Sequence, residues 1–126
     1  MILGIEAILL GSTDAKKLAQ FYKDKVGLKI SMEMEIGEDD EKAFVVRFEN
    51  DVAFSIFDHS KVKGKSKDPN RIMFNLEVDN IEKEVKRLKK NGVKLVQDIY
   101  HVQDYGFVST FVDLDGNYFQ LVKTKE

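Results

Sequence analysis

Residues 111–123 read FVDLDGNYFQLVK, in which a tight Asp-Gly-Asn turn leads directly into an alternating strand. Glycine adopts a positive φ without a Cβ clash, and the flanking Asp and Asn side chains can bond to the nearby backbone, so the turn predicts a hairpin. In the strand that follows, Phe119 and Leu121 point to one face and Gln120 points to the other. Asp-Gly turns of this kind occur in many folds, so the turn alone assigns none.

The composition is that of an ordinary globular chain. Its 126 residues fit one domain with a real core, and 43% are hydrophobic and 33% charged, with a formal net charge of -2. No apolar run approaches the roughly 20 residues of a membrane span, and the first residues lack the pattern of a signal peptide. The near-neutral charge gives no general attraction to nucleic acid. We therefore expect a cytoplasmic protein with no nucleic-acid partner and no membrane partner.

The chain contains no cysteine. This excludes disulfides, thiolate metal sites and a cysteine nucleophile.

The first half of the chain predicts a strand, a helix and three further strands. Residues 5–10 form a short apolar strand, and residues 11–14, GSTD, are a helix-start signal. Apolar residues then recur at helical spacing until Gly27, a natural C-terminal stop. Three alternating or apolar strands are expected at residues 28–36, 43–48 and 52–57.

Residues 58–70, DHSKVKGKSKDPN, interrupt this pattern and hold the only proline. The composition is typical of an exposed linker. A basic patch for phosphate or nucleic acid is the alternative, but lysines without interleaved aromatic residues favour a solvated connector.

After the linker the pattern of the first half begins again. A strand is expected at residues 71–78, and Asp79 with Glu82 three residues later resembles a capping box that starts a helix. Asn91 and Gly92 end that helix. Three strands complete the chain, at residues 93–99, 107–112 and 118–122.

The two halves can be superposed on each other in sequence. Asp14 and Gly27 fall on Asp79 and Gly92, and Phe54-Ser55-Ile56 falls on Phe119-Gln120-Leu121. This indicates internal duplication. We therefore predict an α+β fold in a single domain, 1–126, made of a first βαβββ unit (1–58), a linker (59–70) and a second βαβββ unit (71–126).

Three features together resemble the vicinal oxygen chelate superfamily. They are the paired βαβββ pattern, the end of the first helix at Phe21, Tyr22 and Gly27, and the run GF-x3-F-x-D-x-DGN-x-F-x-L at residues 106–121. The superfamily includes glyoxalase I, extradiol dioxygenases, fosfomycin-resistance thioltransferases and bleomycin-resistance proteins. The resemblance covers essentially the whole chain, although Leu114 stands where the family usually has proline. It implies a curled mixed sheet from the two units, a cleft enclosed by them, and a homodimer.

Catalytic members of this superfamily hold a divalent metal as a Lewis acid, through His, Glu or Gln side chains on the cleft strands. The resemblance places the four ligand positions at Ala7, Ser55, Met73 and Gln120. Borderline divalent metals prefer imidazole or carboxylate ligands, so we expect no metal and no cofactor. A displaced metal site would have to use residues such as Glu6, His59 or His101. For Glu6 the first strand would have to turn its other face to the cleft, which is costly.

Strand alternation predicts which side chains line the cleft, because they lie opposite those that face the helices. The predicted ligand-binding residues are Ala7, Arg47, Ser55, Phe57, Met73, Asn75, Tyr118 and Gln120. This mixture of apolar walls and a few polar groups is typical of a small-molecule pocket. The guanidinium of Arg47 could clamp a carboxylate or phosphate. Alternatively, Arg47 could form an ion pair with Glu77 or lie in solvent at the end of its strand. The side chains of Phe57 and Met73 could equally belong to the hydrophobic core.

Three functions are consistent with this pattern. The favoured one is metal-independent binding of a small, partly apolar molecule in the cleft of a homodimer, as in bleomycin-resistance proteins. The first alternative is a divalent-metal lyase or thioltransferase of the glyoxalase I type with displaced ligands. The second is a non-catalytic structural or regulatory dimer. No acid-base pair stands out, so no catalytic residue is assigned and the balance is against an enzyme.

Overall fold

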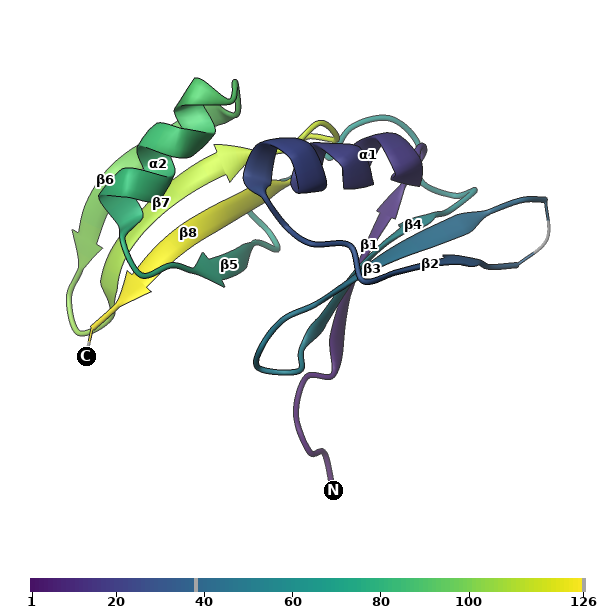
Figure 1. Ribbon diagram of the computed structural model, residues 1–126, viewed down its shortest axis with the longest axis horizontal. Coiled ribbons are helices and arrows are strands. Elements are labelled where there is room, and N and C mark those ends of the chain that lie inside the picture. Colours follow the sequence, from purple (N-terminus) through teal and green to yellow (C-terminus); the bar gives the residue numbers. More distant parts are fainter. Residues whose placement is uncertain (38, 126) are drawn as a thin grey trace. The chain divides into compact units, whose positions relative to one another are not determined.

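The computed structural model describes residues 1–37 and 39–125. The chain divides into two compact units, Met1–Gly64 and Lys65–Glu126, so the boundary falls inside the segment expected to be a linker. Each unit contains one mixed sheet of four strands (Figure 1). The predicted α+β fold of two βαβββ units is confirmed by this topology.

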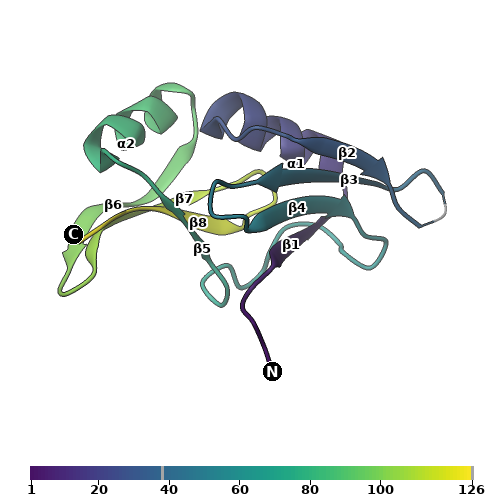
Figure 2. The ribbon, with the colours of Figure 1, turned by 60° about the horizontal axis from the view of Figure 1, so that its bottom comes forward.

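The first unit is a four-stranded sheet with a helix on one face (Figure 2). Its elements are β1 (Ala7–Ser12), α1 (Ala15–Phe21), the π-helix η1 (Tyr22–Val26), β2 (Met32–Glu35), β3 (Lys42–Arg47) and β4 (Ala53–Asp58). The strand order is β1-β4-β3-β2, with β1 parallel to β4 and the other pairs antiparallel. The helix packs on β3 and β4, where the rings of Tyr22 and Phe54 meet edge to face with centroids 5.5 Å apart.

The first helix begins and ends where the sequence predicts. Asp14 is the N-cap, and its carboxylate accepts a hydrogen bond from the backbone N–H of Lys17 at 3.1 Å. At the other end Gly27 adopts a left-handed conformation with φ of 96°. The backbone N–H groups of Gly27 and Leu28 both donate to the carbonyl of Tyr22 at 2.9 Å, which closes the π-helical turn.

The second unit repeats the topology of the first. Its elements are β5 (Phe74–Glu77), α2 (Ile81–Lys90), β6 (Lys94–Val102), β7 (Gly106–Val112) and β8 (Tyr118–Thr124). The order is β5-β8-β7-β6, with β5 parallel to β8. Helix α2 buries Ile81, Val85 and Leu88 against the sheet, at the helical spacing read from the sequence. No helix in residues 1–37 and 39–125 has the length and apolar character to cross a bilayer.

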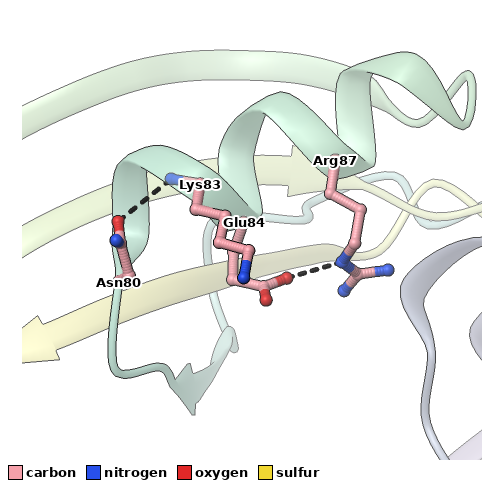
Figure 3. Close-up of polar contacts among 4 residues, drawn as sticks. All are labelled: Asn80, Lys83, Glu84 and Arg87. Atoms are coloured by element: carbon pink, nitrogen blue, oxygen red, sulfur yellow. Dashed lines mark hydrogen bonds and ion pairs between the residues drawn. The ribbon is translucent and has the colours of Figure 1, made fainter.

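The start of α2 differs from the prediction by one residue. Asn80, and not Asp79, is the N-cap: its side-chain oxygen accepts from the backbone N–H of Lys83 at 3.1 Å (Figure 3). One helical turn further on, Arg87 Nε donates to Glu84 Oε2 at 2.6 Å. Asp-Asn offers two adjacent capping residues, and the backbone of Asn80 is the one that adopts the extended cap conformation, with φ of -142°.

Several strands begin or end elsewhere than expected. The expected strand at residues 71–78 is shortened to β5, because the N–H of Arg71 bonds the carbonyl of Asp68 in a turn. The expected strand at residues 28–36 forms regular ladder pairs only over β2. Strand β6 is longer than expected, and its pairing with β7 shifts register between Leu95 and Gln97 and again between Gln97 and Tyr100.

Candidate functional site

One face of the first unit's sheet is turned away from α1. Phe54 and Ile56 of β4 are buried on the helix side, so Ala53, Ser55 and Phe57 lie on the opposite face, which we call the open face of the first sheet. The register pairs Ala7 with Ala53 and Val45 with Ser55. The predicted residues Ala7, Ser55 and Phe57 therefore share this open face.

The open face of the first sheet is mainly apolar. Leu9 lies directly opposite Ser55 on β1 and is 67% exposed. Met32 and Met34 of β2, which pair with Val45 and Ala43, are also exposed. These three side chains were not among the predicted site residues. Alternation in β2 places both methionines on one face, but only the pairing of β2 with β3 shows that it is the open face.

Arg47 lies at the end of β3 and is exposed. Its Nη1 donates to the backbone carbonyl of Asp51 at 3.0 Å, so the guanidinium braces the turn between β3 and β4. Its expected alternative partner, Glu77, accepts a hydrogen bond from Thr124 Oγ1 at 2.9 Å within the second unit. Arg47 thus makes a structural contact through Nη1, and the other N–H groups of its guanidinium lie at the edge of the open face.

The second unit also has an open face, opposite the helix-side residues Phe119 and Leu121. Asn75 of β5 pairs with Gln120 of β8, and Gln120 pairs with Thr110 of β7. The side chains interact as well: Gln120 Nε2 donates to Thr110 Oγ1 at 2.9 Å, and Asn75 Nδ2 donates to Tyr105 Oη at 2.9 Å. Thr110 and Tyr105 were missed, because neither belongs to a recognisable motif and their neighbours are set by strand register.

The other two predicted residues of the second unit lie nearer the ends of its strands. Met73 lies just before β5 and is 39% exposed. Tyr118 opens β8 and pairs with Val112 of β7. The structure therefore places four predicted residues on or beside the open face of each unit.

Three of the four positions that the resemblance assigns to a metal, Ala7, Ser55 and Met73, carry side chains that do not fit a divalent metal, and Gln120 offers only a neutral amide. The direct neighbour of Ser55 on β1 is Leu9, and that of Gln120 on β5 is Asn75, so each pair of strands brings together only a hydroxyl or amide with a neutral side chain. Within residues 1–37 and 39–125 no three His, Cys, Asp or Glu side chains gather so as to hold a metal ion. Hard and borderline divalent cations need several carboxylate, imidazole or thiolate donors.

The candidates for a displaced metal site have other surroundings. The ring of His59 packs edge to face on Phe57 at 5.7 Å, and its Nδ1 accepts from the backbone N–H of Lys61 at 3.1 Å. The ring of His101 lies 5.0 Å from that of Phe107. Glu6 is exposed, and its carbonyl continues the sheet by accepting from Ala53 N at 3.0 Å.

An acidic depression at one end of the first sheet was not expected from the sequence. Its volume is about 300 Å³, and it is lined by Ser12, Thr13, Asp39, Asp40, Glu41, Asp58, His59 and Ser60. The carboxylate of Asp58 is already used: Oδ1 accepts from Ala15 N at 2.8 Å and Oδ2 from Lys42 N at 2.9 Å. Asp58 therefore joins the start of α1 to the start of β3, which is a structural role.

Comparisons with known proteins agree with this fold. The model of the Glyoxalase/Bleomycin resistance protein/Dioxygenase superfamily matches residues 4–121. No curated protein matches the chain by sequence.

Solved structures with the same fold include TnmS3, an antibiotic-binding protein from a Streptomyces species (TM-score 0.77, 20% identity, 98% of each chain covered). The fosfomycin resistance protein FosX from Listeria monocytogenes has a TM-score of 0.73 and 19% identity over 99% of this chain and 96% of its own. A glyoxalase I variant from Zea mays has a TM-score of 0.76 and 16% identity, over 97% of this chain and 46% of its own.

Proposed function

The chain belongs to the Glyoxalase/Bleomycin resistance protein/Dioxygenase superfamily, and from that premise we propose that it binds a small, partly apolar molecule without a metal. One observation carries the proposal. The resemblance places the metal positions of catalytic members at Ala7, Ser55, Met73 and Gln120, and none of these is His, Asp or Glu. A metal-dependent reaction would lack three of its four ligands by this alignment, whereas a binding surface needs only complementary apolar and polar groups.

The open face of the first sheet supports the apolar part of this proposal. Leu9, Met32 and Met34 are 67%, 54% and 44% exposed, and register places Leu9, Ser55, Val45 and Met32 in one line across the four strands. An exposed apolar surface of this kind is typical of binding sites. Covering them would contribute about 25 cal/mol for each Å² of apolar surface removed from water. Methionine side chains are flexible, so they adapt to ligands of different shape.

A further support comes from the relatives. TnmS3 is an antibiotic-binding protein, so this fold can bind a small molecule. The mechanism we propose is sequestration: the apolar side chains of an open face pack on the ligand, and neutral polar side chains on the same face orient it. The ligand leaves unchanged, because no acid, base or nucleophile is needed for binding.

The test is a titration with the uncharged fluorescent probe N-phenyl-1-naphthylamine, in EDTA and then with added Ni²⁺, Zn²⁺ or Mn²⁺. We expect saturable binding that does not change with the metal. Leu9→Glu should weaken binding at least tenfold, because it places a charge in the apolar face. Leu114→Glu is the matched control: Leu114 is 41% exposed but lies in the turn that precedes β8.

Two results would contradict the proposal. The first is binding that appears only when a metal is supplied. The second is stoichiometric Ni, Zn, Mn or Fe in protein purified without a chelator, together with isomerisation of the hemithioacetal of methylglyoxal and glutathione. The second result would favour the glyoxalase-type enzyme.

We also propose that the protein acts as a homodimer in the cytoplasm. In support of a dimer, the segment before β1 is apolar and extended away from the sheet (Figure 2), with Met1, Ile2, Leu3 and Ile5 all at least 74% exposed. A run of exposed apolar side chains of this kind favours burial against a partner chain. The cytoplasmic location follows from the composition and is tested by cell fractionation.

A further inference from the structure

We propose that a row of neutral side chains across the second sheet recognises an uncharged amide-type group, such as a carboxamide or lactam, on the bound molecule. This inference rests on the proposed function and names the chemical class of its ligand. It concerns the open face of the second unit alone.

The row follows from strand register. Asn75 of β5 pairs with Gln120 of β8, Gln120 with Thr110 of β7, and Thr110 with Gln97 of β6. Residues paired across neighbouring strands share a face. One hydrogen-bonding side chain from each of the four strands therefore lies in a single line, which we call the amide row.

The hydrogen bonds within the row leave a defined set of free groups. Gln120 uses one N–H on Thr110 Oγ1, and Asn75 uses one N–H on Tyr105 Oη, both at 2.9 Å. Each primary amide has two donors and a carbonyl acceptor. Within residues 1–37 and 39–125, Gln120 and Asn75 therefore each keep one side-chain N–H and one carbonyl oxygen without a partner, on adjacent strands.

The members of the amide row carry no charge, and apolar side chains flank them. On one side the register places Tyr118 and Val112, and on the other Val122 and Val108. Val122 and Val108 are 3% and 2% exposed, and Thr110 itself is 5% exposed. A charged group placed here would lose hydration without gaining an opposite charge, which is costly.

Two charged residues lie near the row on the same face. Glu77 pairs with Val122 in the next row, and its carboxylate accepts from Thr124 Oγ1 at 2.9 Å. Lys94 pairs with Val112 at the far edge of the sheet and is exposed. Since Glu77 could attract a cation and Lys94 an anion, the test compares all three charge states.

An amide fits this row better than an acid or an amine, because it offers a donor and an acceptor together. A carboxylate offers acceptors alone and would face the carbonyl oxygens of Asn75 and Gln120, and an ammonium offers donors alone and would face their N–H groups. A polar group that loses its water when the ligand binds and finds no partner weakens binding strongly.

The experiment uses three probes with one apolar ring system: naphthalene-2-carboxamide, naphthalene-2-carboxylate and 2-naphthylmethylammonium. Each is titrated into the full chain at pH 7 and followed by backbone amide shifts in two-dimensional NMR. We expect the carboxamide to bind at least tenfold more tightly than either ion, with the largest shifts in β7 and β8.

Two isosteric variants test the row itself. Gln120→Glu and Asn75→Asp each replace an amide by a carboxylate, and each should lower carboxamide affinity about tenfold while raising that of the ammonium probe. Asn75 is exposed, so its variant keeps the test valid if Gln120→Glu disturbs folding. Gln103→Glu, in the exposed turn between β6 and β7, is the matched control and should leave all three affinities unchanged.

The outcomes separate this inference from the proposed function. Binding of the acid or the ammonium as tightly as the amide would overturn the inference and leave small-molecule binding intact. Shifts confined to the first unit, or unchanged selectivity in both variants, would also overturn it. If neither N-phenyl-1-naphthylamine nor any of the three naphthalene probes binds to either unit, both proposals fail together.

Discussion

Asp113 organises the turn between β7 and β8. Its carboxylate accepts from the backbone N–H groups of Asp115 and Asn117, both at 2.9 Å, and from the side-chain amide of Asn117 at 3.1 and 3.2 Å. The residue is 6% exposed, although it is charged. The carboxylate replaces its hydration with these donors, so the turn and the start of β8 depend on it.

Replacing Asp113 should therefore destabilise the protein. We expect Asp113→Ala to lower the free energy of unfolding by about 3 kcal/mol, since buried donors lose a charged acceptor. Urea denaturation followed by circular dichroism measures the change. Asp24→Ala removes an exposed carboxylate from η1 and should stay within about 0.5 kcal/mol. Equal effects of the two substitutions would refute this role for Asp113.

At the scale of single elements, the start of α2 gives a sharp comparison. Asn80 caps the helix and its neighbour Asp79 does not. We expect Asn80→Ala to cost about 1 kcal/mol of unfolding free energy and Asp79→Ala less than about 0.5 kcal/mol. The pair is measured by chemical denaturation under identical conditions. A larger loss of stability for Asp79→Ala than for Asn80→Ala would instead identify Asp79 as the N-cap, as the sequence pattern suggested.

The carboxylate of Asp58 joins two elements of the first unit. It accepts from Ala15 N at the start of α1 and from Lys42 N at the start of β3. Asp58→Asn keeps the shape of the side chain but replaces one acceptor oxygen by an NH2 group, which then faces one of these N–H donors. We therefore expect a loss of about 2 kcal/mol in the free energy of unfolding. Glu49→Gln, an exposed carboxylate between β3 and β4, is the control for denaturation experiments. A cost for Asp58→Asn no larger than the control's would show that the contact is dispensable.

At the scale of the whole molecule, the proposed homodimer can be tested through the apolar segment before β1. Sedimentation equilibrium should give twice the chain mass of 14.5 kDa for the natural sequence. Joint replacement Ile2→Glu and Leu3→Glu should give the mass of one chain, because charges resist burial. Ile72→Glu, at a 79% exposed isoleucine of the second unit, is the control. A single-chain mass for the natural sequence at micromolar concentration would exclude the dimer.

The two βαβββ units could be predicted from the sequence because their signals are local. Alternation, helical spacing and stops such as Gly27 act over a few residues, and the structure follows them. The choice between Asp79 and Asn80 could not be predicted, since both residues are good caps and only the backbone path decides.

The candidate site was less predictable, because it depends on pairing between distant strands. Alternation placed Ser55 and Gln120 on the faces opposite the helices. It could not show that Leu9 and Asn75 are their direct neighbours, because the parallel strands of each unit are far apart in the sequence and no short motif fixes their register.

The parallel pairing of β1 with β4 also constrains the order of events during synthesis. β1 is made first and lies at the sheet edge beside β4, which is the last strand of its unit to leave the ribosome. Closing this long loop must wait for β4, and β5 must wait in the same way for β8, the last strand of the second unit. Each half of the nascent chain therefore carries an edge strand with apolar residues whose partner does not yet exist, and chaperones that shield such segments have two successive intervals in which to act.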